Sequence, residues 1–249
     1  MAIYTVDESQ RKATKVAGML YLVTIAIANV VEFYVRRRVI VPGDAVQTAR
    51  NIAASAQLFR LGVAGDLAMF VGEVILLVAL YVVLKPVNRS LALFAVFCRL
   101  VECSVSAVTV AINFAALLLL SGAGSSQTLP TEQLPRLARL FISLDTGGNR
   151  IGAVFFGMGS MVFAWLWFKS RYVPRLLAAL GILASLVPVL VPLAAIVLSS
   201  LADVPLRRAR TGTPIVIFEV ILGLWLLIKG IHTPPAEVRS SSAPSVSAT

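Results

Sequence analysis

Long apolar runs, separated by short polar or basic stretches, make up most of the chain. A helix needs roughly 20 mostly apolar residues to cross the hydrocarbon of a bilayer, and barrel strands would instead alternate over about 10 residues. The continuous runs therefore predict an all-α polytopic integral membrane protein, a six-helix transmembrane bundle within residues 13–231. The predicted spans are approximately Ala13–Tyr34, Leu61–Leu84, Leu91–Leu120, Gly152–Phe168, Leu176–Leu198 and Pro214–Ile231.

The connections arrange these spans as three hairpins, with the longer connections at one end, the predicted outer end. In the first, Pro42-Gly43 predicts a turn, Asp44 predicts an N-cap, and apolar positions from Ala45 to Phe59 follow a helical period. In the second, "TEQLPRLARLFISLDTGGN" predicts another amphipathic helix that leads into the fourth span. Residues 232–249 are rich in Ser and Pro, which predicts a disordered tail.

The first segment has an alternative interpretation as a cleaved signal peptide. Arg11, Lys12 and Lys15 form a basic start, and Ala26-Ile27-Ala28 resembles a cleavage site. The apolar run nevertheless continues to Tyr34, which favours a retained span.

Composition and charge agree with a membrane protein. The chain is 58% hydrophobic and 14% charged, whereas a soluble domain has about 25% charged residues. The net charge is +10, but the basic residues lie at span ends, where they contact headgroups and set orientation. The bilayer, and not nucleic acid, is therefore the expected partner. Dense basic charge in the loops "KPVNRS" and "KSRYVPR" favours a cell-membrane protein with both termini cytoplasmic, although the outer end is nearly as basic.

Several ionisable residues interrupt the spans, and such residues mark functional sites by default. Counting from the tight turn near Val87 places Glu73 level with Arg99 and Glu102, roughly 15 Å from the turn-side interface. This predicts an intramembrane ion-pair cluster in which Arg99 neutralises Glu73. One arginine against two glutamates leaves a carboxylate that can hold a proton. Either the cluster only fixes helix register, or it is a proton- or substrate-binding site.

The same counting places other polar residues in the outer half, on spans one, two, four and six. We expect them to converge on an outward-facing polar cavity that binds a ligand. The candidate binding residues are Glu32, Asp66, Asn149, Arg150 and Glu219.

Motifs for cofactors and metals are missing from the sequence. The sole histidine, His232, lies in the predicted tail, and no P-loop, dinucleotide fingerprint or HExxH motif occurs. We therefore predict no cofactor and no metal. Cys98 and Cys103 lie about 140° apart on one helix, so they cannot form a disulfide with each other. Gly152, Gly157 and Gly159 are expected to allow close helix contacts.

Four stretches carry a family resemblance: "LFRLGVAGDL", "LYVVLKPVNRSLALFAVFCRLVE", "LLLLSGAG" and "GAVFFGMGSMVFAWLWFKSRYVPRLLAALGILA". From about Thr14 to Ile231 the chain resembles the uncharacterised bacterial multi-span membrane proteins grouped as domain-of-unknown-function family 4386. The resemblance implies a multi-span bacterial membrane protein. It implies no activity and transfers no site residues.

The leading functional hypothesis is a small binding or transport protein that holds a small molecule or lipid in the outward-facing cavity. One alternative is an intramembrane enzyme acting on a lipid-like substrate, with Asp66 or Glu219 as acid or base. The sequence shows no strong nucleophile or cofactor motif for it, which makes an enzyme the weaker hypothesis. Another alternative is a structural or assembly factor whose buried charges only lock helices together.

Overall fold

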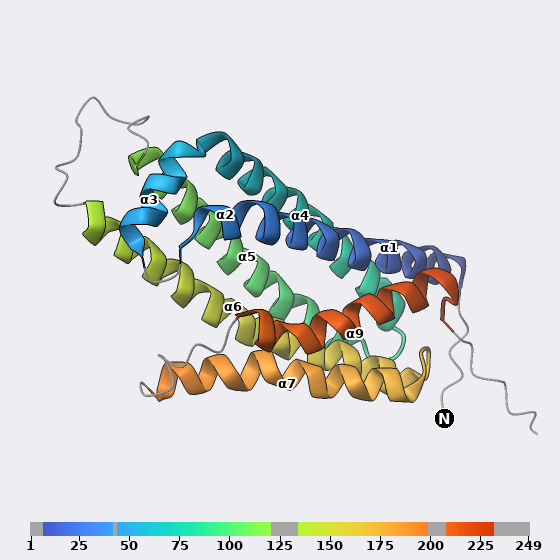
Figure 1. Cartoon of the computed structure of the whole chain (residues 1–249). Coiled ribbons are helices and arrows are strands. Elements are labelled where there is room, and N and C mark those ends of the chain that lie inside the picture. Colours follow the sequence, from blue (N-terminus) through green and yellow to red (C-terminus); the bar gives the residue numbers. More distant parts are fainter. Residues whose placement is uncertain (1–6, 42–43, 121–133, 199–207, 232–249) are drawn as a thin grey trace, which may run out of the picture.

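The computed structural model describes residues 7–41, 44–120, 134–198 and 208–231, and in these ranges the chain is helical, without strands (Figure 1). An α-helix, a π-helix and a short α-helix form one continuous rod at the N-terminal end. The elements are α1 (Glu8–Val30), η1 (Val31–Arg36), α2 (Arg37–Val39), α3 (Ala45–Ala54), α4 (Ala56–Leu84), α5 (Arg89–Leu120), α6 (Leu134–Ser170), α7 (Arg175–Val197) and α9 (Arg208–Ile228).

Five helical segments of the described chain are long and apolar enough to cross a membrane, and this confirms a polytopic helical membrane protein. They are Glu8–Val39, Ala56–Leu84, Arg89–Ala116, Arg139–Ser170 and Arg175–Val197. The sixth predicted span corresponds to a shorter apolar helix, Gly212–Ile228. At about 1.5 Å per residue this segment extends roughly 25 Å, slightly less than the roughly 30 Å hydrocarbon core.

The six long helices form a closed ring in chain order. Helix α1 packs on α4, α4 on α5, α5 on α6, α6 on α7 and α7 on α9, and α9 returns to α1. Figure 1 shows α3 and the start of α6 at one end, and the start of α1 with the end of α9 at the other. We refer to these as the α3 end and the terminal end. Successive helices alternate in direction, as the three predicted hairpins require.

The amphipathic segments agree with the predicted ones in part. The Asp44 carboxylate accepts a hydrogen bond from the Gln47 amide at 2.8 Å, so Asp44 is the N-cap of α3. Helix α3 ends at Ala54, and α4 begins at Ala56 instead of Leu61. The second amphipathic helix leads directly into the fourth span, as predicted, because α6 is continuous from Leu134 to Ser170. The predicted turn at residues 42–43, most of the second connection and the predicted tail at 232–249 lie outside the described residues.

An apolar core fills the terminal half of the ring. Leu80, Leu84, Trp167, Leu222 and Leu226 belong to one cluster and are each 1% exposed or less. They come from α4, α6 and α9, on different sides of the ring. In lipid, such close side-chain packing and not water exclusion holds helices together, so this core fixes the terminal half.

Small residues set the closest helix contacts. A Cβ atom added at Gly18 of α1 would lie 2.7 Å from the Gly223 carbonyl oxygen of α9. On α6, a Cβ at Gly157 would lie 2.9 Å from the Ser185 carbonyl, and one at Gly159 would lie 3.0 Å from the Ala95 carbonyl. The close contacts expected at Gly157 and Gly159 are therefore present, whereas Gly152 has ordinary spacing, with its nearest neighbour at 3.7 Å.

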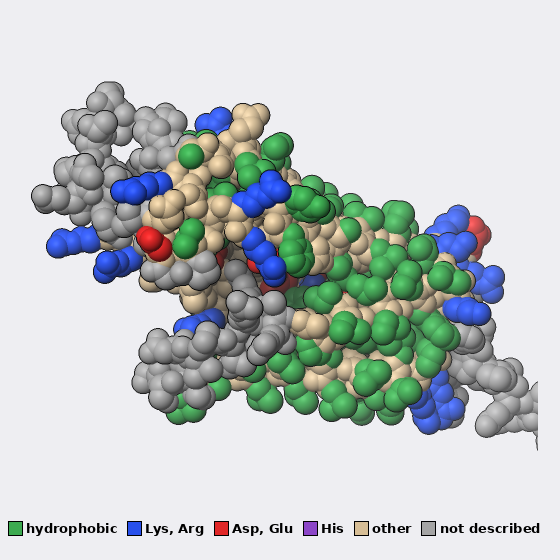
Figure 2. Space-filling model, in the orientation of Figure 1, with side chains coloured by type: hydrophobic (Ala, Val, Ile, Leu, Met, Phe, Trp, Pro, Cys, Tyr) green, Lys and Arg blue, Asp and Glu red, His purple; other side chains and the backbone are tan. Residues whose placement is uncertain are grey.

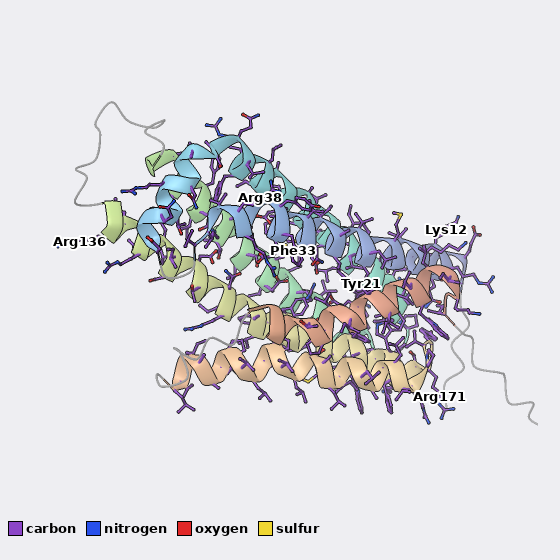
Figure 3. The ribbon with its side chains drawn as sticks, in the orientation of Figure 1. Lys12, Tyr21, Phe33, Arg38, Arg136 and Arg171 are labelled. Atoms are coloured by element: carbon purple, nitrogen blue, oxygen red, sulfur yellow. The ribbon has the colours of Figure 1, made fainter. Side chains whose placement is uncertain are left out.

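The surface has the banding of a membrane protein. Figure 2 shows apolar side chains over the middle of the molecule and lysines and arginines toward both ends. Figure 3 places Lys12 and Arg171 at the terminal end and Arg136 at the α3 end. Arg37 stacks on exposed Phe33, with 4.1 Å from guanidinium carbon to ring centroid. Paired arginine and aromatic side chains of this kind suit the membrane–water interface.

Candidate functional site

A polar cavity of about 150 Å³ opens between α1, η1, α4, α5 and α6. Polar side chains from four of these elements line the cavity together with a few apolar side chains. The lining residues are Ala28, Arg36, Asp66, Met69, Phe70, Ser106, Thr109, Val110, Asn113, Asp145 and Asn149.

An ion pair joins two walls of the cavity. Arg36 Nη2 of η1 donates to Asp66 Oδ2 of α4 at 2.9 Å. The Asp66 side chain is 9% exposed, whereas the Arg36 side chain is 31% exposed. The guanidinium therefore neutralises a buried carboxylate while it retains contact with the cavity opening. Asp66 has its counter-ion from the first span, as a charge at this depth requires.

The π-helical turn explains how Arg36 reaches the cavity. Ala28 and Arg36 both line it, although residues eight positions apart lie about 80° apart on a regular α-helix. The π-helix Val31–Arg36 places more residues in each turn, which rotates Arg36 back toward the face of Ala28. Single π-helical turns inside α-helices frequently occur at functional sites.

The opposite wall carries amide and carboxylate groups. Asn113 Nδ2 of α5 donates to Asp145 Oδ1 of α6 at 2.8 Å. Asn149, one turn further along α6, donates to the Asp145 backbone carbonyl at 2.6 Å. The cavity thus contains the carboxylates of Asp66 and Asp145, the guanidinium of Arg36, and neutral groups that both donate and accept hydrogen bonds.

A buried charge cluster lies deeper in the ring. Arg99 of α5 forms an ion pair with Glu73 of α4, and its Nε also donates to Glu73 Oε1 at 3.1 Å. Glu102 Oε2 lies 4.0 Å from Arg99 Nε. The guanidinium stacks on the Phe156 ring of α6 at 4.0 Å, and its Nη1 donates to Ser160 Oγ at 3.4 Å. The Arg99 side chain is 7% exposed.

Two further helices contribute to this charge cluster. Glu219 of α9 is 8% exposed and interacts electrostatically with Arg99, Glu73 and Glu102. Tyr21 of α1 is 6% exposed and interacts with Glu219, Arg99 and Glu73; Figure 3 shows it beside α9. The charge cluster therefore comprises Tyr21, Glu73, Arg99, Glu102, Ser160 and Glu219, contributed by five of the six ring helices.

Ser106 connects the cavity to the charge cluster. Its side chain lines the cavity, and its hydroxyl donates to Glu102 Oε1 at 3.2 Å. A single group, the Ser106 hydroxyl, thus links the Glu102 carboxylate to the cavity. The two sites therefore form a single polar path from the α3 end to the middle of the ring.

The structure separates the residues that the sequence analysis had grouped together. Asp66 and Asn149 line the cavity. Glu32 is near Arg36, at 4.0 Å, with a side chain 40% exposed, but it is not a lining residue. Arg150 is not a lining residue either, and Glu219 belongs to the charge cluster. Glu219 is not among the lining residues of the cavity, because depth along the axis does not decide which interior site a side chain faces.

The sequence analysis missed Arg36, Ser106, Thr109, Asn113 and Asp145 as cavity residues. One signal was present in the sequence. Arg99, Glu102, Ser106, Thr109 and Asn113 recur at alternating spacings of three and four, which places them along one face of a helix. This polar stripe on α5 predicts the path from charge cluster to cavity. Nothing comparable in the sequence indicates Arg36, since its position depends on the π-helical turn.

A ring of long apolar helices that encloses a few buried charges defines the class of protein, a polytopic integral membrane protein. The chain belongs to the family described as Domain of unknown function (DUF4386), whose sequence profile matches residues 16–230. No curated protein and no solved structure gives a significant match.

Proposed function

We propose that this protein binds a small organic cation in the cavity, and that the α3 end faces away from the cytoplasm of a cell membrane. The carboxylates in the cavity lining carry the proposal. Asp66 and Asp145 line the cavity together with hydroxyl and amide groups. In an environment of low dielectric constant, carboxylate oxygens attract a ligand that brings positive charge.

The remaining lining supports an organic cation over a bare ion. Phe70, Met69 and Val110 offer apolar surface next to the carboxylates, and an aromatic face also attracts an ammonium group. The volume of this cavity is about 150 Å³. A cavity of about this volume in another protein binds benzene. Ammonium compounds from ethanolamine to choline fall within this limit.

The closed terminal half gives the proposal a direction. The apolar core leaves the polar path open toward the α3 end. Release of the ligand on the other side would require a second arrangement of the helices, so the arrangement described here binds the ligand from the α3 end.

The test is ligand-dependent thermal unfolding of the purified protein in detergent. A ligand that binds only the folded state raises the melting temperature as its concentration rises. We expect choline or ethanolamine to do so, and 3,3-dimethylbutanol, the uncharged isostere of choline, to have no effect. Asp66→Asn should abolish the shift, while Glu8→Gln, at an exposed pair on α1, should retain it.

Either of two results would contradict the proposal. One is the absence of a shift with every small ammonium compound tested; the other is an equal shift with the uncharged isostere. If Asp66→Asn instead fails to fold, Asp145→Asn tests the opposite wall of the same cavity.

A further inference from the structure

Glu219 is a buried carboxylate whose ionised form lacks a local partner. It is 8% exposed, and no hydrogen bond or ion pair joins it to another residue of the described chain. Buried polar groups normally have such partners, because an unpaired charge away from water is costly. Its electrostatic neighbours in the described chain are Arg99, Glu73 and Glu102.

The groups around Glu219 carry an excess of negative charge. Tyr21 approaches from α1, Glu73 from α4, and Arg99 with Glu102 from α5, where Cys103 is adjacent. Helix α6 contributes the neutral side chains of Phe156 and Ser160. With every acid ionised, one guanidinium would face three carboxylates. Such an unbalanced site near the middle of a bilayer is strongly disfavoured unless a proton or a cation enters.

The contacts identify the carboxylate that is best suited to hold a proton. Glu73 receives two hydrogen bonds from Arg99. Glu102 is 4.0 Å from Arg99 and accepts a hydrogen bond from Ser106. Both sets of contacts favour the ionised form. Glu219 has no hydrogen bond or ion pair in the described chain, so a proton costs it only the longer-range attraction of Arg99.

We infer that Glu219 holds an exchangeable proton at neutral pH, and that Glu102 and Ser106 connect this proton to water in the cavity. On release, the proton passes from the Glu219 carboxyl group toward Glu102 and then to cavity water, leaving a Glu219 carboxylate. The site is distinct from the proposed cation site, because it would exist whether or not the cavity binds an organic cation.

Infrared spectroscopy of the whole purified protein tests the proton site directly. A protonated carboxyl group gives a carbonyl stretching band separate from that of carboxylates, and this band shifts when deuterium replaces the proton. We expect the band at neutral pH in the wild-type protein, its loss in Glu219→Gln, and its retention in Glu8→Gln. If Glu219→Gln does not fold, Glu219→Asp should keep the band at a changed frequency.

The rate of deuterium exchange tests the path. Ser106→Ala removes the hydroxyl that links Glu102 to the cavity, so we expect exchange of the band to slow by several-fold. Ser104→Ala is the matched control, because Ser104 is exposed on the same helix and donates to the Leu100 carbonyl. No band in the wild type, or a band that persists in Glu219→Gln and disappears in Glu102→Gln, would overturn the assignment to Glu219. Equal exchange rates in the two serine variants would overturn the path.

Discussion

At the scale of single residues, Arg99 makes several kinds of contact within the buried interior of the described chain. It neutralises Glu73, lies near Glu102, donates to Ser160 and stacks on Phe156, so it joins α4, α5 and α6 through one side chain. Its aliphatic stem also lies against Gly159, where an added Cβ would be 2.8 Å from Arg99 Cγ. Loss of Arg99 would therefore leave uncompensated carboxylates and a gap in the packing.

We expect Arg99→Ala to lower the free energy of unfolding by about 3–5 kcal/mol, because it breaks a buried ion pair by removing one partner. Chemical unfolding in detergent measures this. The double variant Glu73→Gln with Arg99→Gln should recover part of the loss, since it leaves no unpaired charge in this pair. Lys12→Ala is the control, because the Lys12–Glu8 pair is at least 76% exposed at both side chains and should contribute little.

Strictly additive effects of Glu73→Gln and Arg99→Gln in this cycle would contradict the energetic coupling of the two residues. Equal destabilisation by Lys12→Ala would show that general charge loss, and not burial, is responsible.

At the scale of elements, α1 has two functions in different parts of its length. Near the terminal end, Gly18 lets its backbone contact α9 at Gly223. Beyond Val30 the same rod continues as η1, which presents Arg36 to the cavity. Figure 1 shows α1 and α9 close together at the terminal end and further apart toward the α3 end. The glycine contact thus closes the ring at the terminal end, while the other end of the rod lines the cavity.

Gly18→Ala should destabilise the protein, because its Cβ would lie 2.7 Å from both the Gly223 oxygen and the Leu227 nitrogen. Backbone atoms cannot rotate away, so the helices must separate, and overpacking of this kind costs about 1–3 kcal/mol. Gly147→Ala is the matched control, since a Cβ there has no neighbour within 4 Å. It should be neutral or slightly stabilising, because alanine favours a helix over glycine by about 0.5–1 kcal/mol.

Melting temperatures of the two variants in one detergent measure the difference. If Gly18→Ala is as stable as Gly147→Ala, α1 and α9 are not in the close contact seen here.

At the scale of the whole molecule, the alternating ring fixes which loops share a side of the membrane. Helix α3 lies at one end, and the turn between α4 and α5 lies at the other with the start of α1 (Figure 1). Arginine is abundant at both ends, so charge alone gives little preference for either orientation. Our proposal that the terminal end is cytoplasmic needs an experiment on the intact membrane.

Cysteines placed at exposed Gln47 on α3 and exposed Ser90 at the start of α5 should react from opposite sides with a membrane-impermeant thiol reagent. The background should lack Cys98 and Cys103, which are buried and free. We expect Gln47→Cys to be labelled from outside intact cells and Ser90→Cys only after permeabilisation. Labelling from the same side would contradict the ring topology, and the reverse pattern would invert the proposed orientation.

The sequence by itself determined the membrane class, the spans to within a few residues for most helices, and the Asp44 cap. These features depend on local composition and periodicity, and neither depends on which distant residues a segment packs against. It also supported the pairing of Glu73 with Arg99, because a tight hairpin fixes which positions of two antiparallel helices lie level. The α5 stripe from Arg99 to Asn113 was likewise readable from spacing alone.

The tertiary structure alone decided which polar residues face one another. The direction of each side chain depends on every turn before it, so the π-helix that ends at Arg36 gives Asp66 its ion-pair partner without any mark in the sequence pattern. The closure of the ring by α9 brought Glu219 within electrostatic reach of Arg99, 120 positions away in the sequence, and Glu219 does not line the cavity. The depth of a residue in the membrane can be counted along an apolar span, but the direction of its side chain depends on how all six helices pack.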